Sequence, residues 1–530
     1  MRNAWAEVTR SAVSMSRLTA VSTEGCPAGE SDTVRAAAQQ PRAKSVSWAA
    51  HRESSASGAD ASVMVIAFRP DYHTRAAMTA SPSPAPAGPR AFRDWRPRLR
   101  LAIAAALLGT GALWLQDVVD PRLRALAGII AFLLVAGACS AQLRAVNLRL
   151  VVSGLALQVG LAVLILKVQI AGVRPGYEFF DWLARVATRF LEFTSAGSKF
   201  VFGVLADPEE MAELFPDGFV LAFASLPILI FMSSVFMVLY HLGVLQVAVK
   251  LMARVMARVM GTSGAESLSA AANVFLGVTE APIIVRPFIA GMTQSELLAL
   301  MIGGLATIAG TVMAIYISLG ADPVAVLTTS VMAAPCGLYL SKILLPETGT
   351  PATVGSVKMV VEREHVNVID ALAAGASNGT RLAINVAAML IAFLAFIAMF
   401  DYGLGRISPN LSLAAIFGWL FAPVAALLGV SSGDLPAVAD LLGIKLATNE
   451  FVAYIKLNGT YLDAISDHSR MVVTFALTGF ANFGSIGILL GGIGGLAPSR
   501  RADLARLGPV ALLGGFLATL INAAIASVLL

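Results

Sequence analysis

The sequence has few cysteines, histidines and charged residues. Of its 530 residues, three are cysteine and five are histidine, and Asp, Glu, Lys and Arg together make up 13%. Cys26, Cys139 and Cys336 show no pairing pattern, and no histidine has the spacing of a metal ligand. The HExxH and Walker-type sequences are absent, so neither a zinc-dependent intramembrane hydrolase nor an ATP-driven pump has a motif to support it. We do not expect an enzyme.

Hydrophobic residues, in contrast, make up 57% of the chain, and the mean hydropathy is +0.76. A helix needs about 20 apolar residues to cross a ~30 Å hydrocarbon layer. The sequence therefore predicts an all-α, multi-pass membrane protein with about nine transmembrane helices, two re-entrant helical hairpins and interfacial helices. The predicted spans are 101–117, 124–141, 149–169, 218–244, 294–318, 323–344, 380–401, 468–493 and 507–529, and the hairpins are 265–289 and 410–457.

Residues 1–97 differ from the rest of the chain in composition. They are rich in Ala, Ser, Arg and Pro, culminate in a Pro-rich run at 81–86 and have no sustained periodicity. We therefore expect a disordered N-terminal extension. Three explanations stay open: an organelle transit peptide, a cytoplasmic tail, or translation that begins near Met78. We assign the extension no function.

Two segments between the spans mix apolar and basic residues at helical spacing. Tyr177–Phe193 combines aromatic residues with arginines and acids, and Leu245–Met260 sets Lys250, Arg254 and Arg258 against Met and Val. Amphipathic helices of this kind lie in the membrane interface. The alternative is a polar loop with chance periodicity.

Basic residues fall on one side of the predicted topology. Cytoplasmic loops carry the excess of Lys and Arg, so nine crossings predict a cytoplasmic N-terminus and a C-terminus outside. The residues on the predicted cytoplasmic side are Arg90, Arg93, Arg96, Arg98, Arg100, Arg144, Arg149, Lys250, Arg254, Arg258, Arg500, Arg501 and Arg506.

Acidic residues interrupt two of the apolar stretches. At the centre of a membrane helix, Asp or Glu costs about 2.5–3.5 kcal/mol on insertion scales, so such residues face the protein interior or a wet cavity. Glu450 lies in one stretch, and Glu280 follows a break at Gly277 in the other. For Glu450, a structural pair with Lys445 and a position at a helix end are the alternatives to a binding role.

The two interrupted stretches predict a duplicated architecture. In the second stretch we place the break at 431–434, and each stretch precedes a long apolar helix with small and polar residues at its middle. Discontinuous helices in corresponding halves are typical of secondary transporters, so we expect an inverted-repeat transport domain with its site at the repeat interface. The predicted domains are the extension at 1–97, the N-terminal and scaffold helices at 98–264, the first hairpin and interrupted helix at 265–322, scaffold helices and a linker at 323–409, and the second hairpin, interrupted helix and last span at 410–530.

Three motifs resemble the concentrative nucleoside transporters. They are Gly443-x-Lys445-x-x-x-Asn449-Glu450-Phe451-Val452-Ala453-Tyr454, the run from Ala265 to Pro282, and Asn482-Phe483-Gly484-Ser485 with the glycine-rich segment after it. The resemblance covers roughly residues 125–530. It implies a homotrimer in which each protomer moves a transport domain past a scaffold domain.

The resemblance also implies a sodium site at the first hairpin and the helix after it. Its ligands are the Asn273 side chain, the Leu276 carbonyl, the Thr307 hydroxyl and the Ile308 carbonyl. Neutral oxygens at a helix break suit a hard cation. Proton-coupled relatives tend to lack Asn at position 273, so its presence favours sodium.

For the nucleoside, the resemblance implies a site shared by both halves. Buried polar groups that expect hydroxyls discriminate against analogues that lack them. Glu450, Asn482 and Ser485 are the implied ribose ligands, Thr279 and Glu280 lie at the nucleobase edge, and Val312 and Phe480 form apolar walls.

Val278 departs from the family pattern, in which Gln is common at this position. Valine neither donates nor accepts a hydrogen bond, so a pyrimidine carbonyl would lose a partner, at a cost of about 1–3 kcal/mol if the gap stays dry. Our hypothesis is that the protein tolerates or prefers purine nucleosides. The alternative is that water fills the gap and selectivity stays broad.

We therefore expect a sodium-coupled symporter that concentrates nucleosides into the cytoplasm by alternating access. It would lie in the cell inner membrane as a homotrimer, with Na⁺, a nucleoside and the lipid bilayer as partners and no nucleic acid. Proton coupling through Glu280 or Glu450 is an alternative within the transporter class. A passive channel or a receptor on the same scaffold is the alternative outside it.

Overall fold

A computed structural model describes residues 95–207, 210–211, 213, 220–354 and 365–530. Within these ranges every regular element is a helix, apart from one isolated bridge between Ile170 and Val173. The predicted all-α class is therefore confirmed. Residues 1–94 of the predicted extension, with Cys26 and Met78, lie outside the described residues.

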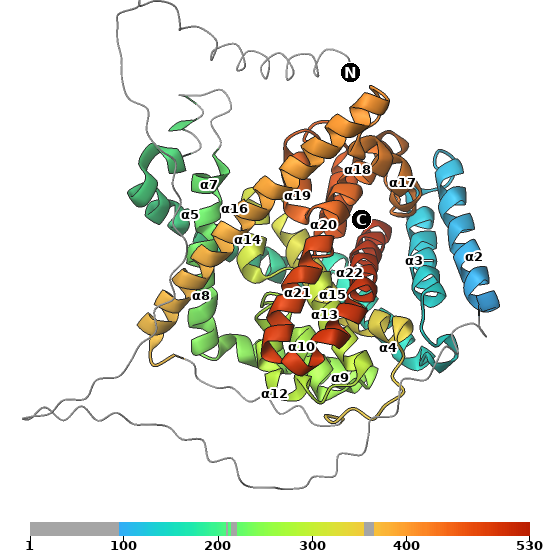
Figure 1. Cartoon of the computed structure of the whole chain (residues 1–530), viewed down its shortest axis with the longest axis horizontal. Helices are drawn as coiled ribbons and strands as arrows, with labels where there is room; N and C mark the ends of the chain where they lie inside the picture. The colour runs from blue at the N-terminus through green and yellow to red at the C-terminus, as the bar shows by residue number, and fades with distance from the viewer. Residues whose placement is uncertain (1–94, 208–209, 212, 214–219, 355–364) are drawn as a thin grey trace, which may run out of the picture. The chain divides into compact units, whose positions relative to one another are not determined.

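Three helices open the described chain, close to the first three predicted spans. They are α2 (Trp95–Trp114), α3 (Pro121–Ala138) and α4 (Leu148–Leu166). Polar residues fix two of the starts: Asp120 accepts a hydrogen bond from the Arg122 amide and Asn147 from the Leu150 amide, as N-caps do. Helix α3 packs on α2 and on the last helix of the chain (Figure 1).

The two segments with amphipathic spacing are helices. They are α5 (Pro175–Phe202) and α9 (Val244–Met260), and between them lie α7 (Leu221–Ala224) and α8 (Leu226–His241). On α9, Val249, Ala253 and Met256 are buried while Arg254 and Arg258 are exposed, so one face packs on the protein. The outer face mixes these arginines with exposed apolar residues, among them Val247 and Leu251.

The rest of the chain repeats one order of elements. The first copy continues from α8 and α9 with α10 (Gly264–Ala272), α11 (Ala281–Ile284), α12 (Arg286–Ile289), α13 (Gln294–Ala306), α14 (Gly310–Ser318) and α15 (Pro323–Leu344). The second copy is α16 (Val368–Ile407), α17 (Leu413–Leu427), α18 (Leu435–Ala447), α19 (Glu450–Asn458), α20 (Asp467–Leu477), α21 (Phe483–Leu496) and α22 (Arg501–Leu529). In each copy a long helix and a second helix precede a broken pair, an interrupted helix and a final long helix.

The break in the second hairpin differs from the predicted one. At the predicted position, Gly429 has a left-handed backbone (φ 75°) and a 3₁₀ turn at Ser432–Asp434 links α17 to α18. The interruption next to Glu450 lies at Thr448 and Asn449 instead. Glycine and aspartate are the stronger stop signals in sequence, whereas this break has neither. Helices α18 and α19 therefore form the acid-bearing hairpin, and α17 is the counterpart of α9.

Helix α16 is longer than the predicted span 380–401 and runs beside α8 (Figure 1). Gly375 and Gly379 lie so close to the α8 backbone that a side chain would not fit. This end of α16 therefore packs through small residues, and it lacks the strongly apolar run by which the span was predicted. Seven of the described helices are long and apolar enough to cross a membrane. Helix α2 is not among them because its first six residues include three arginines. The predicted span 468–493 is divided between two shorter helices, α20 and α21. The count of nine crossings stays a prediction.

Candidate functional site

The interruptions after α13 and after α20 lie against each other. The Phe480 amide donates a hydrogen bond of 3.3 Å to the Thr307 carbonyl. Gly479 has a φ of 134°, and a Cβ there would lie 2.9 Å from the Ala306 carbonyl oxygen. The small residues at the middle of both helices thus allow two non-helical backbones to meet inside the protein.

This contact predicts that Gly479→Ala destabilises the protein by more than about 1 kcal/mol, since Ala is strained at positive φ and would press on the α13 backbone. Gly491→Ala is the matched control, because Gly491 lies within α21 and a Cβ there meets nothing within 4 Å. Thermal unfolding of the purified protein in detergent should show a lower midpoint for Gly479→Ala and an equal or higher one for Gly491→Ala. Equal midpoints for Gly479→Ala and the unmodified protein would contradict the prediction.

Glu450 is buried at the first turn of α19, with 4% of its surface exposed. The Tyr316 hydroxyl donates to its Oε1 (2.7 Å), and the Asn482 amide donates to its Oε2 (3.0 Å). The Asn482 Oδ1 accepts from both the amide and the hydroxyl of Ser485, which fixes the direction of the Asn482 side chain. The structure therefore brings together Glu450, Asn482 and Ser485, the three residues that the family resemblance assigned to the ribose.

Lys445 is fully buried but does not bind Glu450. Its ammonium donates to the Ala476 carbonyl (2.6 Å) and to the Thr519 hydroxyl (2.9 Å). Among the described residues no ion pair joins Lys445 to Glu450, so the structural pair considered from the sequence is not present. The positive charge lies at the C-terminal end of α20, where the partial negative charge of the helix dipole stabilises it.

The predicted sodium ligands gather at the ends of α10 and α13. Asn273 caps α10, and its Nδ2 donates to the Ser269 carbonyl (3.0 Å), while Thr307 caps α13 and donates to the Gly303 carbonyl (2.9 Å). A Cβ on Gly303 would lie 2.9 Å from the Asn273 Nδ2, so both caps contact Gly303. Leu276 is also buried in this region.

One atom of this group lacks a hydrogen-bond partner within the described part of the chain. The Asn273 Oδ1 is buried and accepts no hydrogen bond there. A buried amide oxygen without a donor is costly, and it lies where the C-terminal ends of two helices present partial negative charge. The donor set, an amide oxygen, a hydroxyl and the backbone around Ile308, fits a hard cation.

The residues assigned to the nucleobase side contact different parts of the protein. Val278 packs against Gly304 of α13, and Thr279 packs against Gly492 of α21, so the first hairpin contacts both halves of the chain. Glu280 is partly buried, and its Oε2 accepts from the Gly277 amide (3.1 Å).

Val312 and Phe480 complete the predicted set. Val312 is buried one turn before Tyr316 on α14, and Phe480 is half-buried at the break after α20. In the described chain the two carboxylates have separate partners, and no hydrogen bond joins Glu280 to Glu450. That both line one cavity stays a prediction.

Sequence reasoning did not assign Tyr316 or Tyr454 to the site, although Tyr454 ends the first motif. Their rings stack with centroids 4.6 Å apart, and both are fully buried. Helical spacing could have indicated them, because Tyr316 lies four residues after Val312 and Tyr454 four residues after Glu450. Each tyrosine therefore lies on the same helix face as a predicted site residue.

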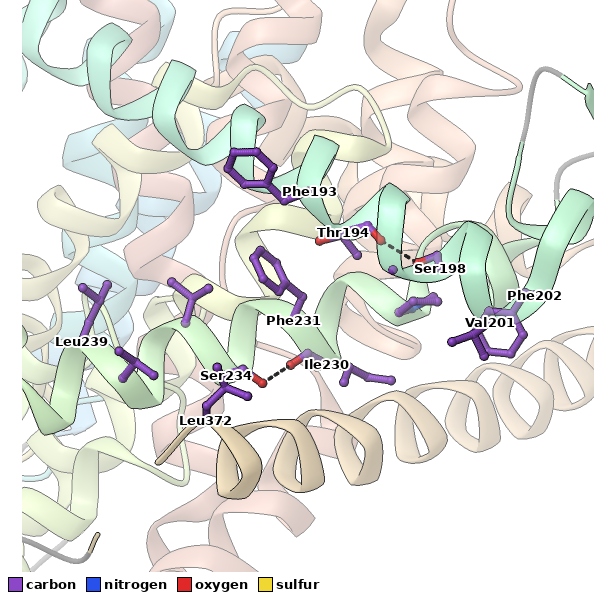
Figure 2. Close-up of a pocket in the computed structure, with 14 residues that line it drawn as sticks. Phe193, Thr194, Ser198, Val201, Phe202, Ile230, Phe231, Ser234, Leu239 and Leu372 are labelled. Carbon is purple, nitrogen blue, oxygen red and sulfur yellow. Dashed lines mark hydrogen bonds between the residues drawn. The ribbon is translucent and has the colours of Figure 1, made fainter. Parts of the chain in front are cut away.

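A cavity of about 580 Å³ lies elsewhere, between α5, α8 and Leu372 of α16 (Figure 2). Its lining is almost entirely apolar. The hydroxyls of Thr194, Ser198 and Ser234 donate to carbonyls of their own helices, so none of them has a donor left for a polar ligand. Since a nucleoside needs placed polar groups, we do not regard this cavity as the substrate site.

Paired helix interruptions that hold a buried carboxylate, amides and an unpartnered oxygen are typical of a secondary transporter. Family models for the Na⁺ dependent nucleoside transporter N-terminus, nucleoside recognition (Gate) and the Na⁺ dependent nucleoside transporter C-terminus match residues 127–205, 222–323 and 325–527. The chain belongs to the Na⁺ dependent nucleoside transporter family. This confirms the predicted function, sodium-coupled nucleoside symport.

Relatives match most of the chain. An uncharacterised transporter of Haemophilus influenzae is 43% identical over 76% of this chain and 97% of that protein. Human sodium/nucleoside cotransporter 1 is 40% identical over 80% of this chain and 67% of that protein. The solved structure of CNTnw in an inward-facing, substrate-bound state is 41% identical, covers 77% of this chain and 97% of that one, and has a TM-score of 0.72. The preference for purines, hypothesised from Val278, stays an untested prediction.

Proposed function

We propose that the protein binds one nucleoside and sodium together and carries both into the cytoplasm by alternating access. The observation that carries this proposal is the buried Glu450 carboxylate, which is held by Tyr316 and Asn482 at the place where the two repeats meet. A carboxylate and an amide at fixed positions bind sugar hydroxyls and reject ligands without them.

Sodium binds, in this proposal, at Asn273, Leu276, Thr307 and Ile308. The unpartnered Asn273 oxygen supports the assignment. Inward movement of one sodium ion is worth about 2.3 kcal/mol per 100 mV, which suffices to concentrate the nucleoside more than about tenfold. Thr279, Glu280, Val312 and Phe480 face the nucleobase, with Val278 beside them.

The proposed orientation places the start of α2 in the cytoplasm and the C-terminus outside. Hydrogen bonds from Arg98 to the Ala141 carbonyl and from Arg500 to the Met292 carbonyl hold basic residues at helix ends on the predicted cytoplasmic side. Ala141 follows the C-terminal end of α3. The Leu530 carbonyl, at the C-terminus, instead accepts from Arg122 at the N-terminal end of α3. This arrangement supports opposite sides for the two ends.

A homotrimer in the cell inner membrane completes the proposal. The outward surface of α16 supports it, because few of the 40 residues of this helix are buried within the chain while several large apolar ones are exposed. An apolar surface of this extent is covered by lipid or by another subunit. The exposed large apolar residues of α16 include Ile384, Ile391, Leu394, Phe396, Met399 and Phe400.

Replacing sodium by choline at fixed pH tests the proposal. In proteoliposomes we expect uptake of labelled uridine or adenosine that saturates with concentration and falls at least tenfold without sodium. Uptake that persists in choline and responds to a pH gradient would favour proton coupling through Glu280 or Glu450. Uptake that does not saturate and needs no gradient would indicate a channel.

A further inference from the structure

Tyr316 is a buried residue of α14 that contacts the proposed ribose carboxylate directly. Its hydroxyl donates to the Glu450 Oε1 at 2.7 Å, and the side chain is fully buried. Helix α14 belongs to the first repeat and Glu450 to the second, so this hydrogen bond joins the two halves at the site.

The Tyr316 ring has little freedom to turn. It stacks on Tyr454, with ring planes 25° apart, and meets the Phe451 ring edge-on at 6.1 Å. The Tyr454 hydroxyl is in turn hydrogen-bonded to the Thr478 hydroxyl (2.8 Å) and the Thr474 carbonyl (3.0 Å). The hydroxyl of Tyr316 is therefore presented to Glu450 from a rigid support.

The two hydrogen bonds to Glu450 leave acceptor capacity for a sugar. An ionised carboxylate has about four lone-pair positions on two oxygens. Tyr316 uses one on Oε1, Asn482 uses one on Oε2, and the main-chain amide of Glu450 also donates to the carboxylate. The carboxylate still keeps acceptor capacity, and the donors from Tyr316 and Asn482 fix the direction in which it points.

We propose that Tyr316 is a positioning residue that sets the preference of the site for ribose over deoxyribose. It holds Glu450 in the rotamer whose free lone pairs meet the 2′- and 3′-hydroxyls. The inference rests on the proposed function, because it takes Glu450 as a ligand of the sugar. Without the Tyr316 hydroxyl, the carboxylate turns toward other donors, and the sugar hydroxyls lose a preorganised acceptor.

Tyr316→Phe tests this inference because it removes one hydroxyl and keeps the ring stack. We would measure inhibition constants of uridine, 2′-deoxyuridine and 3′-deoxyuridine against uptake of labelled uridine. The expected result is about a tenfold weaker inhibition by uridine, with a much smaller change for at least one deoxy analogue, so that the ratio between them shrinks. An equal loss for all three nucleosides, or no loss, would overturn the proposal.

Tyr339→Phe is the matched control. It deletes the hydroxyl of another fully buried tyrosine, on α15, whose hydrogen bond goes to the Gln158 side chain (2.8 Å) and not to Glu450. The ratio of inhibition constants should stay as in the unmodified protein. If transport by Tyr316→Phe is too slow to follow, equilibrium binding to the purified protein gives the same ratio.

Glu450→Gln separates failure of this inference from failure of the proposed function. Unimpaired uptake by Glu450→Gln would remove the proposed function and the inference together. Loss of uptake in Glu450→Gln combined with an unchanged ratio in Tyr316→Phe would remove the inference alone.

Discussion

Replacing Glu450 by glutamine is expected to lower sodium-dependent nucleoside uptake by more than about 100-fold. Glutamine has nearly the same shape but loses the negative charge, and it offers one acceptor oxygen where the carboxylate offers two. Both carboxylate oxygens are already bonded, to Tyr316 and to Asn482. Hydrogen bonds to a charged group are worth about 1.5–3 kcal/mol each, so weakening two of them accounts for a loss of this size.

The measurement is uptake of labelled nucleoside into proteoliposomes, with thermal unfolding of the same preparation to show that the variant is folded and its oligomer assembled. Glu347→Gln is the control. Glu347 is also paired and partly buried, with Lys342 at 3.4 Å, but it lies in the segment after α15 and away from the helix breaks. It should transport nearly as the unmodified protein does. Normal uptake by Glu450→Gln would refute the assignment of Glu450 to the sugar.

Asn273→Leu should remove the stimulation of nucleoside binding by sodium. Leucine is close to asparagine in size but lacks the Oδ1 atom, which is buried without a hydrogen-bond partner in the described structure. If that oxygen binds sodium, the variant binds nucleoside in the presence of sodium as weakly as the unmodified protein does without it. Linkage requires that the nucleoside also cease to strengthen sodium binding.

Calorimetric titration of nucleoside with and without sodium checks this expectation. Asn458→Leu is a matched control in the other hairpin, because the Asn458 amide also donates to a carbonyl four residues earlier, that of Tyr454, at 3.3 Å. Its binding should keep the full dependence on sodium. The same dependence in Asn273→Leu would exclude Asn273 as a ligand.

Much of the architecture could be predicted because lipid imposes strong rules on sequence. Long apolar runs placed α3, α4 and α13 to α15 within a few residues of their ends, and α22 at its C-terminal end. An acid in an apolar stretch is costly enough to mark a site, and this reasoning led to Glu450, which the structure buries beside Asn482.

Other features depended on contacts that sequence spacing does not encode. The break at Thr448 has no glycine or proline, so stronger stop signals at 429–434 drew the prediction away from it. Lys445 and Glu450 are five residues apart and of opposite charge, yet the helix that ends at Ala447 directs Lys445 to Ala476. Tyr316 looks like an ordinary core residue until α19 is placed beside it.

The hydrogen bond from the Phe480 amide to the Thr307 carbonyl connects the loop proposed for the ion to the loop proposed for the sugar. Both atoms belong to the main chain, so no side-chain replacement removes the bond except proline at position 480. If Val278 and Val312 lie beside the nucleobase as proposed, substitutions there can change the range of accepted bases while this link stays intact. In evolutionary terms, substrate range is free to diversify in such a protein without uncoupling transport from the ion gradient that drives it.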